Sequence, residues 1–267
     1  MIYMMNKDRK HIKLNFVFMG DSRIRQQFYN FLKLIPDYDR VTNPTQIPKM
    51  WTAFHGDVDV DSSILSLRVS FKWRHLINDD AIRVMYQWVA SEQTERPNLI
   101  FLGIEVYYMM QQYGANFQLY NKNLMELRLI LQKLSNITQV IWLNQYPTLE
   151  RYGNINDRNT DIHSTKIHHY NKYVHHIFGN ESNIRIWDSG NPLAEEYVRG
   201  CEILEREIPN PQFIKTGPEQ FINSRPYVNC LDFIHTGYLA LSKATQLLYN
   251  DICNAKLFSE QVYKTFK

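Results

Sequence analysis

The strongest guide to the fold of this chain is the segment from 13 to 34, where an apolar strand leads straight into a helix. The strand closes with Gly20, and Asp21 and Ser22 follow at once. Apolar residues then recur at helical spacing up to Leu32, and Pro36 ends the helix. A strand that stops where a helix begins is the basic unit of an α/β protein.

The same order of strand and then helix recurs along the rest of the chain. We predict further strands at 65–73, 97–103, 139–143 and 184–187, and helices at 78–91, 117–134, 162–178, 192–206 and after Thr236. The polar segment 37–61 is expected to be irregular, and the proline-rich segment 207–229 a long loop. The sequence therefore predicts a single α/β domain over 1–267, with its core at 13–254 and a peripheral tail at 255–267. Its architecture would be a three-layer α/β/α sandwich around a mostly parallel sheet.

Serine, aspartate and histidine occur in an arrangement that suggests nucleophilic catalysis. Ser22 stands at the end of the first strand, while Asp232 and His235 lie just before the last helix. A nucleophile, an orienting carboxylate and a base are the parts of a serine relay. Neither half of the pattern is specific alone, but their combination with an α/β framework favours Ser22, Asp232 and His235 as a catalytic triad.

Groups that could stabilise an oxyanion are expected at the same edge of the sheet. The Ser22 N–H lies at a helix start, where free amides and the helix dipole favour negative charge. Gly103 closes the buried strand at 97–103, and Asn144 and Gln145 follow the strand at 139–143. Both side-chain amides remain candidates.

Three charged residues near these strand ends are candidates for substrate binding. Arg23 and Arg25 could hold a phosphate or a carboxylate, although an arginine here could equally anchor a neighbouring loop, and for Arg25 we favour the anchor. Glu105 follows the strand at 97–103 and could contact an acceptor or simply lie at the rim. These assignments stay open on the sequence.

Composition excludes several other classes. The formal net charge of +3, without recurring basic blocks, does not indicate a nucleic-acid binder. No apolar run reaches the length of a membrane span, and three cysteines are too few for a disulfide framework or a zinc site. The histidine pairs at 168–169 and 175–176 fit a solvated helix face better than a metal site, so no metal is expected. Sequons at Asn136 and Asn180 matter only in the secretory pathway.

Four segments resemble the conserved blocks of the SGNH-type hydrolases, and within them the PC-esterase-like serine domain of the sialic-acid O-acetyltransferases. The run Gly-Asp-Ser-Arg-Ile-Arg-Gln within 18–29 resembles the nucleophile block. The segments 97–103 and 142–147 are similar to the second and third blocks, and 232–235 is similar to the Asp-x-x-His block. The resemblance covers roughly 15–254.

This resemblance implies a flavodoxin-like sheet and transfer of acetyl from acetyl-CoA, through an acetyl-serine, to a sialic acid presented as CMP-sialic acid in the Golgi lumen. Phe233 and Ile234 stand where the family usually has glycine and leucine, so we expect a pocket of different shape. The family's membrane region is absent here, so we expect a soluble chain that is a fragment or a soluble relative. Two alternatives remain: a carbohydrate O-acetylesterase with the same triad, and a non-catalytic glycan-binding domain.

Overall fold

The structure is a computed structural model of the 267-residue chain, and it describes residues 13–46, 54–110, 114, 116–148, 162–180, 183–207, 234–236 and 238–254. Its centre is a seven-stranded sheet of order β2-β3-β4-β1-β5-β6-β7. The strands are β1 (Leu14–Gly20), β2 (Val41–Asn43), β3 (Val58–Ser62), β4 (Leu67–Trp73), β5 (Leu99–Gly103), β6 (Gln139–Leu143) and β7 (Ile184–Trp187). The neighbouring strands β4, β1, β5, β6 and β7 all run parallel to one another.

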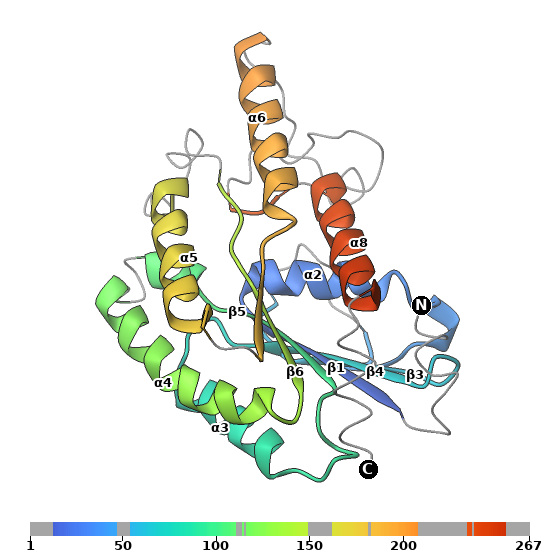
Figure 1. Cartoon of the computed structure of the whole chain (residues 1–267). Coiled ribbons are helices and arrows are strands. Elements are labelled where there is room, and N and C mark those ends of the chain that lie inside the picture. The colour runs from blue at the N-terminus through green and yellow to red at the C-terminus, as the bar shows by residue number, and fades with distance from the viewer. Residues whose placement is uncertain are drawn as a thin grey trace.

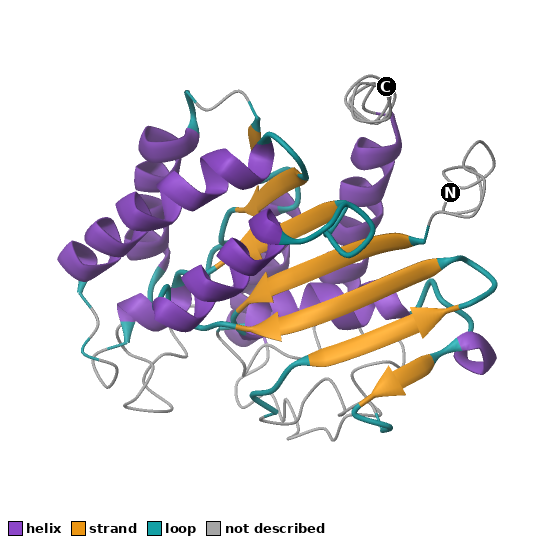
Figure 2. Cartoon of the chain, turned by 90° about the horizontal axis from the view of Figure 1, so that it is seen from below, coloured by secondary structure: helices purple, strands orange, loops and turns teal. Residues whose placement is uncertain are grey.

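Helices cover both faces of this sheet (Figures 1 and 2). They are α2 (Ser22–Leu32), α3 (Asp79–Ala90), α4 (Phe117–Ser135), α5 (Ser164–Phe178), α6 (Asn191–Glu207) and α8 (Tyr238–Asn254), with short 3-10 helices η1 (Asp37–Asp39) and η2 (Val106–Met109). Helix α8 contacts α2 and α6, while α4 contacts α3 and α5. The predicted three-layer α/β/α class with a mostly parallel sheet is therefore confirmed.

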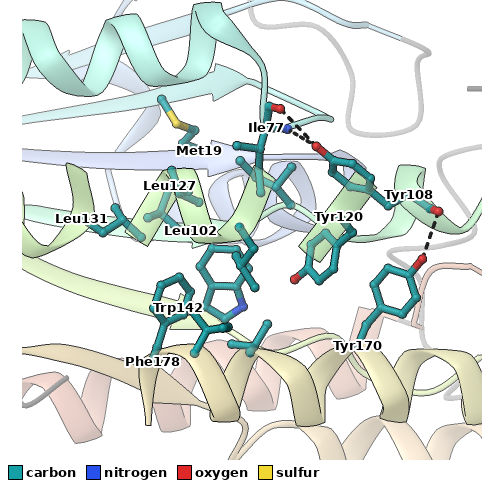
Figure 3. Close-up of a cluster of buried hydrophobic side chains, with 14 of the residues drawn as sticks. Met19, Ile77, Leu102, Tyr108, Tyr120, Leu127, Leu131, Trp142, Tyr170 and Phe178 are labelled. Atoms are coloured by element: carbon teal, nitrogen blue, oxygen red, sulfur yellow. Dashed lines mark hydrogen bonds between the residues drawn. The ribbon is translucent and has the colours of Figure 1, made fainter. Parts of the chain in front are cut away.

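The central strands bury side chains on both faces because successive side chains of a strand point in opposite directions. In β5, Phe101 packs in the core beneath α2 and α8, whereas Leu102 packs in the core beneath α4 and α5. Figure 3 shows this second core, where the Trp142 indole lies against Phe178 with ring centroids 5.3 Å apart. Such continuous burial explains why these strands read as apolar runs in the sequence.

The expectation of irregular structure at 37–61 was wrong in part. Strands β2 and β3 form here and extend the sheet by antiparallel pairing, β3 against β4 and β2 against β3. Val58 and Val60 point inward and alternate with Asp59 and Asp61, so β3 is a short strand whose charged outer face hid the pattern. Asp39, just before β2, accepts hydrogen bonds from the N–H and the hydroxyl of Ser63, just after β3, and so ties together these two ends of the pair.

The other predicted strands and helices are found within a few residues of their expected bounds. Apart from Glu207, the predicted loop at 207–229 lies outside the described residues, as does the predicted tail at 255–267. The single-domain boundary stays a prediction. Across the described ranges, no helix is both long and apolar enough to cross a membrane.

Candidate active site

Ser22 is the first residue of α2, and Asp21 alone separates it from the carboxyl end of β1. Asp21 caps the helix, since its Oδ1 accepts the Arg23 N–H at 2.9 Å, and the helix therefore starts at the serine. Gly20 is required beside it, because a Cβ there would collide with the Gly103 carbonyl of the neighbouring strand. The local sequence thus places a hydroxyl at the positive end of a helix dipole.

His235 reaches Ser22 from the far end of the chain. Its Nε2 lies 2.8 Å from Ser22 Oγ, although the two residues are 213 positions apart. Ser22 is 8% exposed and His235 is half-buried. This geometry pairs a hydroxyl with a base, as nucleophilic catalysis requires. The third predicted member, Asp232, lies outside the described residues.

The two candidate amides lie in different surroundings. Asn144 Nδ2 lies 3.0 Å from His175 Nε2 on α5, so its side chain turns toward that helix. Gln145 is 2% exposed, and a Cβ built on Gly103 would lie 3.3 Å from Gln145 Nε2. Gly103 itself pairs with Gly20 across β1 and β5. The Gln145 amide is therefore aimed at the strand ends that flank Ser22.

Arg23 joins the segments of the site from within the protein. Its Nε donates to the Ile234 carbonyl at 2.9 Å, and its Nη1 donates to Gln145 Oε1 at 3.1 Å. The same Nη1 donates to the Tyr146 carbonyl at 2.7 Å, and the guanidinium lies 4.0 Å from the Tyr146 ring centroid. Since Arg23 is 2% exposed, these contacts favour an internal clamp over the alternative of an anion ligand.

Arg25 anchors a loop, as expected. Its Nη1 donates to the Phe54 carbonyl, and its guanidinium lies 5.5 Å from the centroid of the Trp73 ring. The side chain is buried, and that burial lowers the pKa of the guanidinium. Arg25 thereby ties the second turn of α2 to the loop that precedes β3.

Glu105 does not lie at the rim. Its side chain is 0% exposed and accepts a hydrogen bond of 3.0 Å from Trp142 Nε1. Burial, with a smaller contribution from the nearby Asp21 carboxylate, raises the pKa of Glu105 to about 8. Glu105, two residues after β5, turns into the protein beside Trp142, so its carboxyl is largely protonated at pH 7 and does not reach the surface.

Asp21 was missed as a site residue. It is fully buried, and besides the Arg23 amide it accepts the Val106 N–H at 3.4 Å through Oδ2. Burial raises the pKa of Asp21, while Arg23, these amides and His235 act in the opposite direction. The signal was present in the sequence, because an aspartate directly before a helix is a preferred N-cap. Asp21 thus supports the turn that presents Ser22.

The histidines of α5 face solvent: His168, His169, His175 and His176 are all exposed. Among the residues that the structure describes, no group of three or more potential ligands could hold a metal ion. The described part of the site therefore consists of a hydroxyl, an imidazole, an amide and a buried guanidinium.

A comparison with known proteins yields a distant relative. No family model matches the chain. Over 138 residues, 50% of this chain, the sequence is 32% identical to the N-acetylneuraminate (7)9-O-acetyltransferase of Danio rerio. The matched part is 16% of that protein, so the chain spans less than a fifth of its curated relative. This match supports a distant relationship to that acetyltransferase.

Proposed function

We propose that this protein is a serine-dependent O-acetyltransferase that moves acetyl from acetyl-CoA to a sialic acid. The observation that carries the proposal is the 2.8 Å contact between Ser22 Oγ and His235 Nε2 at the start of α2. The distant relative supports the substrate class, because its name describes acetyl transfer to N-acetylneuraminate. CMP-sialic acid as the acceptor form, and the Golgi lumen as the compartment, come from the family resemblance.

The first half-reaction would acylate Ser22. With the imidazole proton on Nδ1, His235 Nε2 takes the Ser22 proton as Oγ attacks the thioester carbonyl. The carbonyl π electrons move to oxygen, then return as the C–S bond breaks, and His235 gives its proton to the departing CoA sulfur. We assign Asp232 to hold Nδ1–H and stabilise the imidazolium.

In the second half-reaction, a sugar hydroxyl would give its proton to His235 and attack the acetyl carbon. The C–O bond to Ser22 breaks, and Ser22 Oγ recovers the proton. The oxyanion of both steps would be bound by the N–H groups of Ser22 and Gly103 and by a side-chain amide. Of Asn144 and Gln145 we assign Gln145, because Arg23 fixes its Oε1 and leaves Nε2 directed toward Gly103.

The test compares the wild-type protein with Ser22→Ala, using acetyl-CoA with and without CMP-sialic acid and mass spectrometry of the products. We expect acetylated sugar from the wild type, and turnover at least about 1000-fold lower in Ser22→Ala. Ser91→Ala at the end of α3 is the control, and it should keep the wild-type rate. Unchanged rates in Ser22→Ala would overturn the serine mechanism.

Two other outcomes would redirect the assignment. Release of acetate without acetylated sugar would indicate an acetylesterase or a different acceptor, because water can resolve the same acetyl-serine. No turnover, combined with no labelling of Ser22 by a fluorophosphonate probe, would indicate a glycan-binding domain that has lost catalysis.

A further inference from the structure

Four aromatic side chains form a cluster at the carboxyl end of β4, which we call the ring wall: His55, Trp73, His75 and Tyr107. The His55 and His75 rings lie nearly parallel to the Trp73 ring, with centroid distances of 4.4 and 5.6 Å and interplanar angles of 13° and 27°. Tyr107 stands perpendicular to Trp73 at 88°, with its centroid 4.8 Å from that of His75. These contacts hold the rings in one arrangement.

The polar rings of the wall are its outer members. Trp73 is 8% exposed, while His55 is exposed and His75 and Tyr107 are half-buried. Behind the indole, the buried Arg25 guanidinium holds the chain at Phe54, directly before His55. The polar rings of the wall therefore lie on the outer side of a buried indole, and because the rings already pack on one another, little side-chain entropy would be lost when a ligand binds.

The ring wall adjoins the turn that carries Ser22. Trp73 is paired with Gly20 in the parallel register of β1 and β4, and the Arg74 N–H donates to the Gly20 carbonyl at 3.0 Å. Tyr107 follows Val106, whose N–H donates to the Asp21 carboxylate. The wall thus reaches the nucleophile turn from two elements, β4 and η2.

Trp73 and His75 of the wall lie on the other side of β1 from the oxyanion groups Gly103 and Gln145. In the sheet order β4-β1-β5-β6, Trp73 ends the strand on one side of Ser22, and Gln145 follows the second strand on the other side. Tyr107 alone comes from the β5 side. A transferase must bring an acceptor to the acyl carbon from a direction that the oxyanion donors leave open, and the strand order places Trp73 on the side of β1 opposite Gln145.

The chemistry of the wall suits a hydroxyl-rich ring. Partial burial lowers the pKa of both His55 and His75, and the Arg25 charge also lowers that of His55, which favours the neutral imidazole in both. A neutral imidazole has one donor and one acceptor, which matches a hydroxyl group, whereas a cationic imidazole could only donate. Ring faces also provide flat apolar surface for the C–H face of a sugar, as aromatic side chains commonly do in ligand sites.

We propose that the ring wall binds the sugar ring of the acetyl acceptor and presents one of its hydroxyls to the acetyl-Ser22 carbon. This assignment rests on the proposed transferase function, whose substrate class it places at a defined surface. It makes His55, His75 and Tyr107 acceptor-binding residues, distinct from the residues that act on the donor thioester.

Binding to Ser22→Ala protein tests the assignment without relying on turnover. The Kd values of N-acetylneuraminate, CMP-N-acetylneuraminate and acetyl-CoA are measured by calorimetry in Ser22→Ala alone and with His55→Ala and His75→Ala added. We expect the sialic-acid Kd to rise about tenfold in the wall variant while the acetyl-CoA Kd stays unchanged. His168→Ala, which removes an exposed histidine of α5, is the matched control, and circular dichroism checks the fold.

Two variants of Tyr107 guard against a structural effect of the double histidine substitution. Tyr107→Phe keeps the ring and removes the hydroxyl, while Tyr107→Ala removes the ring face, so the alanine variant should weaken sialic-acid binding more. Binding of both sialic acids at wild-type affinity in all wall variants would overturn the assignment and leave the transferase function standing. Weaker acetyl-CoA binding in the wall variants would also overturn it, because the wall would then serve the donor.

The remaining outcome separates the two proposals. If neither sialic acid binds Ser22→Ala while fluorophosphonate labels Ser22 in the wild type, the serine chemistry stands. The assignment of sialic acid as the acceptor is then wrong, and the ring-wall assignment is wrong with it.

Discussion

Arg23 connects three parts of the site that are distant in the sequence. Its donors reach the carbonyl before His235, the Gln145 side chain and the Tyr146 backbone. A side chain that is 2% exposed does this without contacting solvent, so its role in the proposed reaction is to position the groups that react. The sequence left Arg23 open between an anion ligand and an anchor for a neighbouring loop, because the direction of a side chain depends on its neighbours in space.

Replacing Arg23 with lysine should lower kcat by about 100-fold and leave KM for the acceptor nearly unchanged. Lysine keeps the charge but cannot form three directed hydrogen bonds, so Gln145 and His235 lose their common support. Steady-state kinetics of Arg23→Lys and of the exposed control Arg83→Lys measure this difference. A large rise in KM at constant kcat would instead identify Arg23 as a substrate ligand.

Glu105 makes the stability of the folded state depend on pH. Its pKa is about 8 in the folded protein, against a usual value of 4.5, so the folded state holds a proton that the unfolded state has already released. Stability therefore falls as the pH rises from about 4.5 to about 8, and the loss is complete above the folded pKa.

The Glu105→Gln variant should lack this loss. Glutamine keeps an oxygen that can accept from Trp142 Nε1 but does not ionise. We expect the variant to be more stable than the wild type at pH 8 by a few kcal/mol, because a tenfold change in proton affinity corresponds to about 1.4 kcal/mol. Urea denaturation of both proteins at pH 5 and pH 8 measures the effect. The same pH dependence in both would show that Glu105 is not the responsible group.

At the scale of elements, the start of α2 combines a structural cap with the nucleophile. Asp21 accepts the Arg23 N–H, just as Asn78 accepts the Ala81 N–H at 3.0 Å at the start of α3. The two caps are chemically similar, but only Asp21 also accepts from Val106 and lies next to Ser22. Variants at Asp21 and at Asn78 therefore separate the stability that is lost with a helix cap from the activity that is lost when the turn at Ser22 is disturbed.

Asp21→Ala and Asn78→Ala should each destabilise the protein by about 1–2 kcal/mol, because each leaves a helix N–H without its acceptor. Only Asp21→Ala should also lower acetyl transfer strongly, and Asp21→Asn should recover much of the lost stability. Denaturation and rate measurements on the three variants provide the test. Equal activity in the two alanine variants would show that the turn holds Ser22 without Asp21.

Secondary structure could be predicted from the sequence where a strand or helix has an apolar signal of its own. Strands such as β5 and β6 are buried on both faces, so apart from Gln139 at the start of β6 they carry no polar side chain. Strand β3 was missed because Asp59 and Asp61 alternate with its two valines in the antiparallel part of the sheet, next to the edge strand β2. A strand of an antiparallel pair can carry charge on its solvent face, which makes its composition resemble that of a loop.

For the whole molecule, the parallel sheet explains how the parts of the site come together. Strands β1, β5 and β6 end at one edge, where Ser22 comes after β1, Gly103 ends β5 and Gln145 comes after β6. Helix α8 packs on α2, and the segment before α8 brings His235 to Ser22. The ring wall joins the same edge through β4. Parallel strands end together, so residues far apart in the sequence meet at one edge.

The sequence by itself determined the α/β class, the order of the main elements and the types of residue that could act as nucleophile and base. These follow from local periodicity and from the Gly-Asp-Ser and Asp-x-x-His patterns. Tertiary structure alone decided that Glu105 is buried, that Arg23 faces inward and that Gln145, not Asn144, points toward Gly103. The physical reason is that burial and side-chain direction depend on packing between segments that are remote in the sequence, which no local pattern encodes.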